Sequence, residues 1–219
     1  MAGCSSARPN SDRGAGKSGQ GDEPGSLLAR TVETIQVPRG STIHVDGHIA
    51  SKEWDRTAIA TITVRDDWKS QVRVKHDNQF LYFLFEGVKH DGERLFPEIL
   101  IDPKNRKGDH WEKGQWWFHV SGNLCEGNGE PNVYRTNGVF QCAHLKDGWV
   151  GNNPPATDTT NIEIRVSFAK LGIRPTPGLR LGLALSLTDA TGDTKQQWFF
   201  WPERGRIDFP ATWGNAVLE

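Results

Sequence analysis

The chain has 219 residues, enough for one domain of ordinary size with a hydrophobic core. Its formal net charge is −1, and its basic residues are spread along the chain, so no field that attracts nucleic acid or anionic lipid is expected. No run approaches the roughly 20 consecutive apolar residues that cross a bilayer as a helix. Composition therefore argues against a nucleic-acid-binding protein and against a helical membrane span.

Residues 1–30 are predicted to form a flexible tether. The first 26 are rich in Gly and Ser and almost free of large apolar side chains, so they bury too little surface to offset their chain entropy. The start, Met-Ala-Gly-Cys, has the shape of the end of a bacterial lipoprotein signal, although the charged start and apolar stretch of such a signal are missing. We expect lipidation at Cys4 and export to a bacterial cell envelope, with the lipid as the membrane contact. The alternative is a cytoplasmic protein with an unrelated cysteine.

Residues 31–219 are predicted to form a domain of β-strands. From Ile43 onward, apolar residues mostly recur with a period of two, the period of strands. The alternation is clearest at 161–168 and 178–190, whereas 79–88 is apolar on both faces, as a central strand covered on both sides would be. Further strands are predicted at 71–76, 98–102, 115–120 and 214–219, with short helical turns around Trp54 and at 167–173. Many strands, Gly- and Pro-rich turns and few helices predict an all-β, antiparallel β-sandwich of immunoglobulin-like type.

The sequence DHWEKGQWWFHV, at residues 109–120, concentrates three tryptophans. With a period of two, Trp116 faces the core, while Gln115, Trp117 and His119 share the opposite face. Polar side chains on a buried face would need buried partners. An aromatic ring flanked by hydrogen-bonding groups instead suits a sugar, whose C–H face it covers. Trp117 is therefore predicted to be a stacking surface, with Trp111 as a second, exposed ring in a polar loop. The alternative for Trp117 is a packing ring at a sheet edge.

The remaining cysteines, Cys125 and Cys142, bracket a segment rich in Gly and Asn. A disulfide between them would close a loop of about 17 residues and stabilise the fold by ~3 kcal/mol. Such a bridge requires an oxidising compartment, which agrees with export. The alternative is two unrelated buried thiols.

Five segments occur in an order that is shared with a known family. They are IHVDGHIASKEWDRTA, VRVKHDNQFLYFLFE, EILIDPKN, IEIRVSFAKLGIRPTPGLRLGLALSLTDA and FPATWGNAVLE. Together they resemble the strands and turns of family 9 carbohydrate-binding modules, from Ile43 to Leu218. The resemblance implies a DOMON-like β-sandwich that binds sugars or glycan chain ends without catalysis, with a glycoside hydrolase as a possible partner.

The resemblance also assigns site residues. Glu98 matches the sugar-contacting carboxylate of the family, and His119 falls where the family has a basic contact, usually Arg. The two tryptophans that clamp the sugar in the family do not carry over, since their positions fall at Gly92 and near Ile207. Stacking would then come from other rings, namely Trp117, Trp111, Phe96 or Trp198.

Structural calcium, common in this family, has a candidate loop at TDATGDT with Asp189 and Asp193, and no other cofactor is expected. A haem carrier of the Met/His type is not supported, because the one methionine, Met1, lies in the tether. Bis-His ligation stays formally open.

Two further alternatives to a binding module remain. One is a structural or protein-interaction sandwich that has lost its sugar site, as the missing clamp suggests. The other is an accessory domain with glycoside hydrolase activity. Glu98 and Asp102 point to the same face of one strand but lie about 13 Å apart, beyond the roughly 5–9.5 Å between glycosidase carboxyl groups. A cross-strand pair of Glu98 with Glu86 or Glu112 is not required by the sequence.

Overall fold

The computed structural model describes most of the chain after Thr31. The described residues are 32–50, 52–89, 95–120, 124–129, 148–152, 159–189 and 197–219. Val32–Glu219 form one compact unit. The predicted tether of residues 1–30, with Cys4, lies outside the described residues and stays a prediction.

The larger of two sheets has seven strands among the described residues, in the order β1-β12-β10-β5-β6-β7, with β11 also paired to β10. Its strands are β1 (Thr34–Val37), β5 (Leu95–Asp102), β6 (Trp116–Val120), β7 (Leu124–Gly127), β10 (Arg180–Asp189), β11 (Gln197–Trp201) and β12 (Gly214–Leu218). Neighbouring strands are antiparallel, except that β1 runs parallel to β12.

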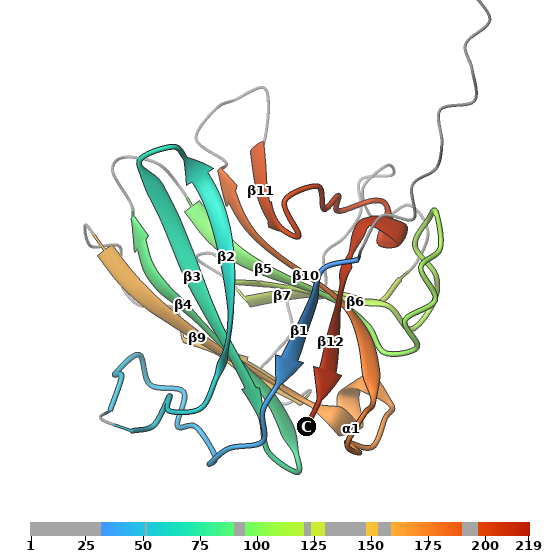
Figure 1. Cartoon of the computed structure of the whole chain (residues 1–219), viewed down its shortest axis with the longest axis horizontal. Helices are drawn as coiled ribbons and strands as arrows, with labels where there is room; N and C mark the ends of the chain where they lie inside the picture. The colour runs from blue at the N-terminus through green and yellow to red at the C-terminus, as the bar shows by residue number, and fades with distance from the viewer. Residues whose placement is uncertain are drawn as a thin grey trace, which may run out of the picture. The chain divides into compact units, whose positions relative to one another are not determined.

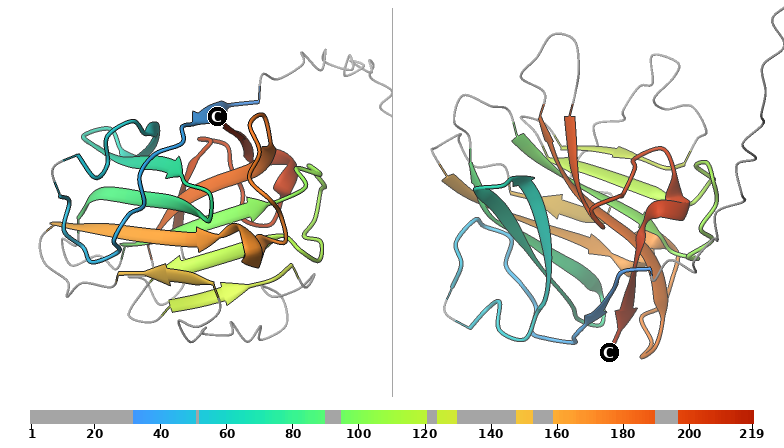
Figure 2. Two further views of the ribbon diagram at one scale, coloured as in Figure 1. Left: turned by 90° about the horizontal axis from the view of Figure 1, so that it is seen from below. Right: turned by 45° about the horizontal axis from the view of Figure 1, so that its top comes forward.

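The smaller sheet has five strands among the described residues, in the order β2-β3-β4-β9-β8, and all of its pairs are antiparallel. Its strands are β2 (Ala58–Arg65), β3 (Trp68–His76), β4 (Phe80–Lys89), β8 (Trp149–Gly151) and β9 (Thr159–Ser167). The two sheets pack face to face (Figures 1 and 2). The predicted all-β sandwich is therefore confirmed. The described residues also contain one helix, α1 (Phe168–Leu171), and one 3₁₀ turn, η1 (Pro210–Thr212).

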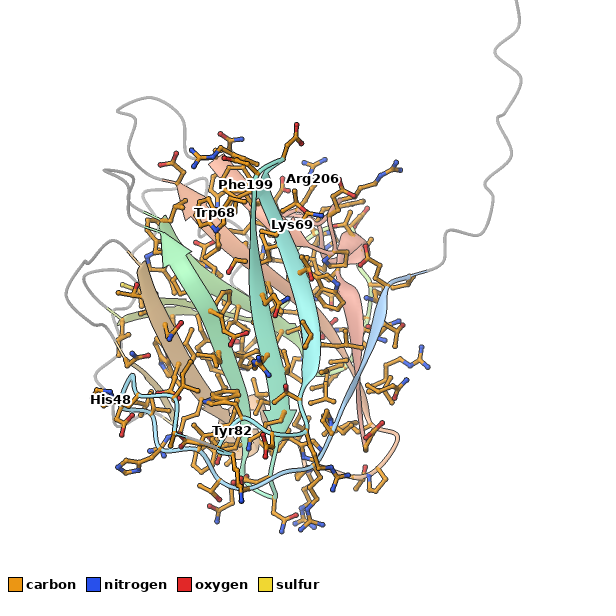
Figure 3. The ribbon with its side chains drawn as sticks, turned by 60° about the vertical axis from the view of Figure 1, so that its left-hand side comes forward. His48, Trp68, Lys69, Tyr82, Phe199 and Arg206 are labelled. Carbon is orange, nitrogen blue, oxygen red and sulfur yellow. The ribbon has the colours of Figure 1, made fainter. Side chains whose placement is uncertain are left out.

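The main core lies between the sheets and follows the predicted alternation. From β10 it takes Leu181, Leu183, Leu185 and Leu187, and from β4 it takes Leu81, Phe83 and Phe85. The central position predicted for β4 is confirmed, because its other face is buried as well. There Tyr82 and Leu84 pack against Ile43 and Trp54 in a second cluster. Figure 3 shows Tyr82 on the side of the sheet along which the segment with His48 runs.

The predicted helical turn at 167–173 is confirmed as α1. The Ser167 hydroxyl caps it by accepting a hydrogen bond from the Lys170 N–H at 3.1 Å, and Gly172, with φ of 69°, ends it in the left-handed region. The short turn predicted around Trp54 is present at residues 52–54 and does not extend into a helix. Lys52 and Arg56 have φ of 75° and 53°, which a right-handed helix does not admit. No helix among the described residues is long and apolar enough to cross a membrane.

Candidate functional site

The face of the larger sheet that points away from the main core carries a group of polar side chains on three neighbouring strands. Strand register sets Glu98 of β5 opposite His119 of β6 on one side and opposite Ser186 of β10 on the other. Thr188 follows Ser186 on the same face of β10. We call Glu98, His119, Ser186 and Thr188 the Glu98 cluster.

Glu98 is the centre of this cluster and is almost fully buried, with 2% of its surface exposed. Its Oε2 accepts hydrogen bonds from the Ser186 hydroxyl at 2.9 Å and from the Thr188 hydroxyl at 2.8 Å. Its Oε1 lies 3.1 Å from Nδ1 of His119. These contacts hold the carboxylate in one orientation and direct Oε1 toward the histidine.

Two aromatic rings border the Glu98 cluster. The Phe96 ring meets the His119 ring edge-on, with 4.2 Å between the centroids. Register places Phe96 on one side of Thr188 and Trp198 of β11 on the other. Both Phe96 and Trp198 are half-buried. Four of the predicted site residues, Glu98, His119, Phe96 and Trp198, are thus brought together at one end of the sheet.

Trp117 does not present a stacking surface, and that prediction is wrong. Its side chain is only 3% exposed, although its ring lies 5.2 Å from that of His119. It belongs to an apolar cluster on the outer face of the larger sheet, with Leu100, Ala184, Phe200 and Trp213. The polarity of Gln115 and His119 was misleading, because the cross-strand neighbour of Trp117 is the apolar Leu100.

Trp111 is half-buried and not the freely exposed ring that its polar loop predicts. Its Nε1 donates a 2.7 Å hydrogen bond to the Ile207 carbonyl oxygen, and its ring meets that of Trp213 edge-on at 5.1 Å. The Trp111 indole therefore lies beside Ile207. Family 9 modules have their second clamp tryptophan near the position of this residue.

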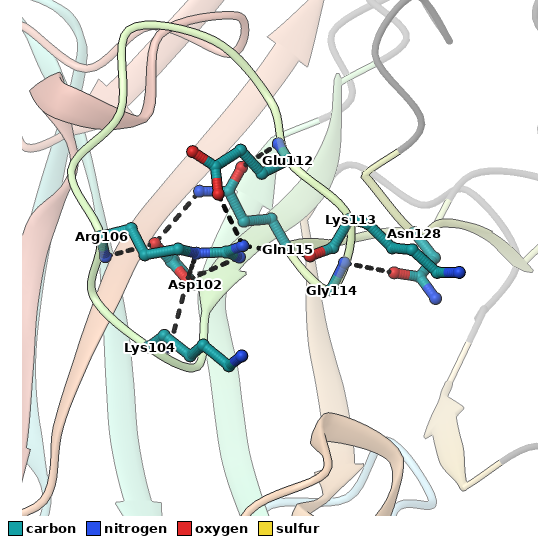
Figure 4. A network of polar contacts seen from close by, with 8 residues as sticks. All are labelled: Asp102, Lys104, Arg106, Glu112, Lys113, Gly114, Gln115 and Asn128. Carbon is teal, nitrogen blue, oxygen red and sulfur yellow. Dashed lines mark hydrogen bonds and ion pairs between the residues drawn. The ribbon is translucent and has the colours of Figure 1, made fainter.

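A polar network fixes the segment between β5 and β6 on this face (Figure 4). Asp102 is 1% exposed and accepts hydrogen bonds from the Gln115 amide at 3.1 Å and from the Arg106 guanidinium at 3.1 and 3.2 Å. Arg106 also pairs with Glu112 at 2.8 Å. Burial raises the pKa of Asp102, but the hydrogen bonds from Gln115, Arg106 and the Lys104 N–H outweigh it and lower that pKa below its ordinary value. Asp102 is thus a structural anchor of this segment.

Several predicted features fall partly or wholly outside the described residues. Cys125 lies on β7 opposite His119 and is buried, but Cys142 is not described, so the disulfide stays a prediction. Gly92 is likewise not described. The candidate calcium loop has Asp189 at the end of β10, whereas Asp193 is not described. Within the described ranges, no group of three or more His, Cys, Asp or Glu side chains could hold a metal ion.

Ser186 and Thr188 were not among the predicted site residues. The signal for them was present, because the alternation of β10 sets its leucines on one face and these hydroxyls on the other. What the sequence did not contain is the register that places β10 beside Glu98.

Solved structures share this architecture, although no family model and no curated protein matches the sequence. A family 9 carbohydrate-binding module from Caldicellulosiruptor kristjanssonii in complex with cellotriose aligns with a TM-score of 0.62 and 14% identity, over 85% of this chain and 94% of that one. A family 9 module from the same organism in complex with glucose gives 0.61 and 14%, over 85% and 96%. A candidate carbohydrate-binding protein from Bacteroides uniformis gives 0.56 and 13%, over 86% and 100%.

The chain has a family 9-like fold. The first two neighbours are described as binding modules, not as enzymes. At 13–14% identity the likeness establishes the family 9-like architecture and leaves the site to be argued from the residues of this chain.

Proposed function

We propose that this protein is a non-catalytic carbohydrate-binding module that holds a sugar or glycan chain end at the Glu98 cluster. The observation that carries the proposal is the buried Glu98, held by Ser186, Thr188 and His119 at an end of the sheet bordered by half-buried rings. A carboxylate and an imidazole hydrogen-bond sugar hydroxyls, and an aromatic ring covers the C–H face of a pyranose. The cellotriose and glucose complexes of the structural neighbours support the same ligand class.

The exposed parts of the Glu98 cluster and its rings are small. The His119 side chain is 12% exposed, and Phe96 and Trp198 are each half-buried. Few groups therefore contact a hydrated ligand, and we expect modest affinity with a favourable enthalpy of binding.

Calorimetry and tryptophan fluorescence with glucose, cellotriose and a wider panel of oligosaccharides test the proposal. Wild type should bind at least one of these sugars saturably. Glu98→Gln, which keeps the shape but removes the charge, should weaken binding about tenfold, as expected for a hydrogen bond to a charged group. Glu33→Gln, at an exposed glutamate beside β1, is the matched control and should bind as wild type does.

A structural or protein-interaction role is the second candidate. The burial of Trp117 and the missing tryptophan clamp of family 9 modules favour it, because both remove a ring that would stack on a sugar. A correctly folded protein that binds no sugar in the panel would support this candidate and overturn the first.

Hydrolysis has less support. The partners of Glu98 among the described residues are a histidine and two hydroxyls, and a second carboxyl group is not among them. Release of reducing sugar that disappears in Glu98→Gln would establish it.

We further propose that the protein is exported, lipidated at Cys4 and bridged between Cys125 and Cys142, and that it works beside a glycoside hydrolase at the cell envelope. The small residues before Cys4, the polar tether and the even cysteine pair support this. Mass spectrometry of the protein from its native membrane would detect the lipid on Cys4. Peptide mapping without reductant would detect the bridge, and recovery of only unmodified Cys4 and free thiols would refute both assignments.

A further inference from the structure

His119 has one ring nitrogen engaged and the other without a hydrogen bond to any described residue. Nδ1 lies 3.1 Å from Oε1 of Glu98. Among the described residues, the ring also lies against the aromatic side chains of Phe96 and Trp117, and Cys125 of β7 is the cross-strand neighbour of His119. The side chain is 12% exposed, against 3% for that of Glu98, so the histidine is the more accessible member of this pair.

The contact with Glu98 fixes the tautomer of the neutral ring. An ionised carboxylate only accepts hydrogen bonds, so Nδ1 must carry a proton. In the neutral imidazole, Nε2 is then an acceptor, and a sugar hydroxyl would donate to it. In the imidazolium, Nε2 also carries a proton and becomes a charged donor.

The two states of His119 also change the charge that a ligand meets. Glu98 is the charged side chain that contacts His119 among the described residues. The other members of the Glu98 cluster, Ser186 and Thr188, are uncharged, and so are the neighbouring rings of Phe96 and Trp117. The pair is therefore anionic when the ring is neutral, and it has no net charge when the ring is protonated.

We propose that His119 makes the ligand selectivity of the Glu98 cluster depend on pH. With the neutral ring, the site selects uncharged, hydroxyl-rich sugars, because Nε2 of His119 is an acceptor and the charge of the Glu98–His119 pair repels anions. With the protonated ring, a sugar carboxylate receives a charge-assisted hydrogen bond from Nε2 and no longer meets a net negative charge. Uronic acids are thus admitted when the ring is protonated. This inference rests on the proposed sugar-binding function of the same site.

Matched pairs of neutral sugar and uronate give the test. Dissociation constants for glucose and glucuronate, and for galactose and galacturonate, are measured by calorimetry at pH 8 and pH 5.5. We expect the ratio of uronate affinity to neutral-sugar affinity to rise about tenfold in wild type as pH falls, as a hydrogen bond that becomes charge-assisted would give.

Variants assign the effect to His119. In His119→Gln the ratio should no longer change with pH, although affinity itself is weakened. In His119→Arg, which is cationic at both values, the uronate preference should persist at pH 8. His48→Gln, at an exposed histidine on the outer side of the other sheet, is the control and should respond as wild type does. Melting curves at both pH values confirm folding, and if His119→Arg does not fold, wild type against His119→Gln still decides.

The outcomes separate the two proposals. A sugar that binds with a pH-independent ratio, or a pH response that survives in His119→Gln, would overturn the inference and leave the proposed function intact. Absence of binding by every sugar at both pH values would overturn the proposed function and the inference with it.

Discussion

The indole Nε1 of Trp54 donates a 2.9 Å hydrogen bond to Oε1 of Glu163, across 109 positions of the chain. The other carboxylate oxygen accepts from the backbone N–H groups of Asp46 at 3.0 Å and Gly47 at 2.8 Å. Glu163 lies on β9 and has no exposed surface. One buried carboxylate therefore holds the segment before β2 against the outer face of the smaller sheet, while the Glu98 cluster lies on the outer face of the larger one.

Glu163→Ala should lower the free energy of unfolding by about 3 kcal/mol, because it leaves three donors without their buried acceptor. Trp54→Phe removes one of these hydrogen bonds and keeps a ring, so its loss should be about 1 kcal/mol. Urea denaturation measures both, with Glu33→Gln as the surface control. Sugar affinity should not change in either folded variant. A Glu163→Ala protein as stable as wild type would show that this carboxylate does not hold the segment.

Asp102 should make the protein sensitive to acid. Its pKa in the folded state is below the ordinary 3.8, because hydrogen bonds from Gln115 and Arg106 outweigh its burial. A lowered folded-state pKa contributes stability that is present above the ordinary value and lost as pH falls through the folded one. Denaturation of wild type and Asp102→Asn from pH 7 to pH 3 should show a large difference in stability near pH 7 that shrinks at the acid end. Asp208→Asn, at an exposed ion pair with Arg206, should show neither effect.

Lys107 should make the free energy of unfolding depend on pH in the alkaline range. Its ammonium group donates to the carbonyl oxygens of Trp213 and Gly214. Burial lowers the pKa of Lys107 to about 8, opposed by the charge of Asp102 and assisted by that of Arg180. Between about pH 8 and the ordinary 10.5, the unfolded chain binds the extra proton, so the free energy of unfolding rises with pH. Chemical denaturation of wild type and Lys107→Met between pH 7.5 and pH 10.5 measures this rise in the free energy of unfolding. The rise should be smaller in Lys107→Met. An equal rise in both proteins would contradict the assignment.

The strands with strong alternation could be predicted from the sequence, and those fixed by distant partners could not. β10 and β9 were evident because every second residue is apolar over at least seven positions. β2 alternates as clearly, although it was not among the predicted strands. β1, however, has four residues and pairs with β12 from the opposite end of the chain, as in Thr34 with Asn215. β8 has only three residues. Such short strands are formed by their neighbours more than by their own sequence.

The candidate site also has one part that the sequence predicts and one part that depends on tertiary contacts. The resemblance to family 9 modules assigns Glu98 and His119 to the candidate site, and the structure adds that they touch. Trp117 was misassigned because periodicity gives the face of a strand but not what covers that face. Segments distant in the sequence, with Phe200 and Trp213, cover it here. Burial of a face depends on tertiary contacts that alternation does not encode.

Trp117 and Trp198 should therefore respond oppositely to substitution. Trp117→Ala removes a buried ring and should lower the free energy of unfolding by about 3–5 kcal/mol. Trp198→Ala removes a half-buried ring beside the Glu98 cluster, so it should cost less stability and weaken sugar binding more. Urea denaturation and calorimetry on both variants make the comparison. Strong loss of binding in a stable Trp117→Ala protein would restore Trp117 as the stacking ring.

The hydroxyl of Thr188 should position Glu98 for its ligand. Thr188 is 1% exposed, so its role is to hold Oε2 of Glu98 at 2.8 Å while Oε1 stays directed toward His119. Thr188→Val keeps the shape and removes the donor, which should weaken sugar binding about fivefold and cost about 1 kcal/mol of stability. Thr188→Ser retains the hydroxyl and should recover most of the affinity.

The matched control for Thr188→Val is Thr63→Val, on an exposed position of β2 in the other sheet, which should leave affinity unchanged. Calorimetry measures the affinity, and urea denaturation gives the stability of each variant. If Thr188→Val loses stability but binds sugar as tightly as wild type, the hydroxyl only supports packing. If Thr188→Ser binds sugar as weakly as Thr188→Val, the hydroxyl alone does not position Glu98, because the serine still donates to it.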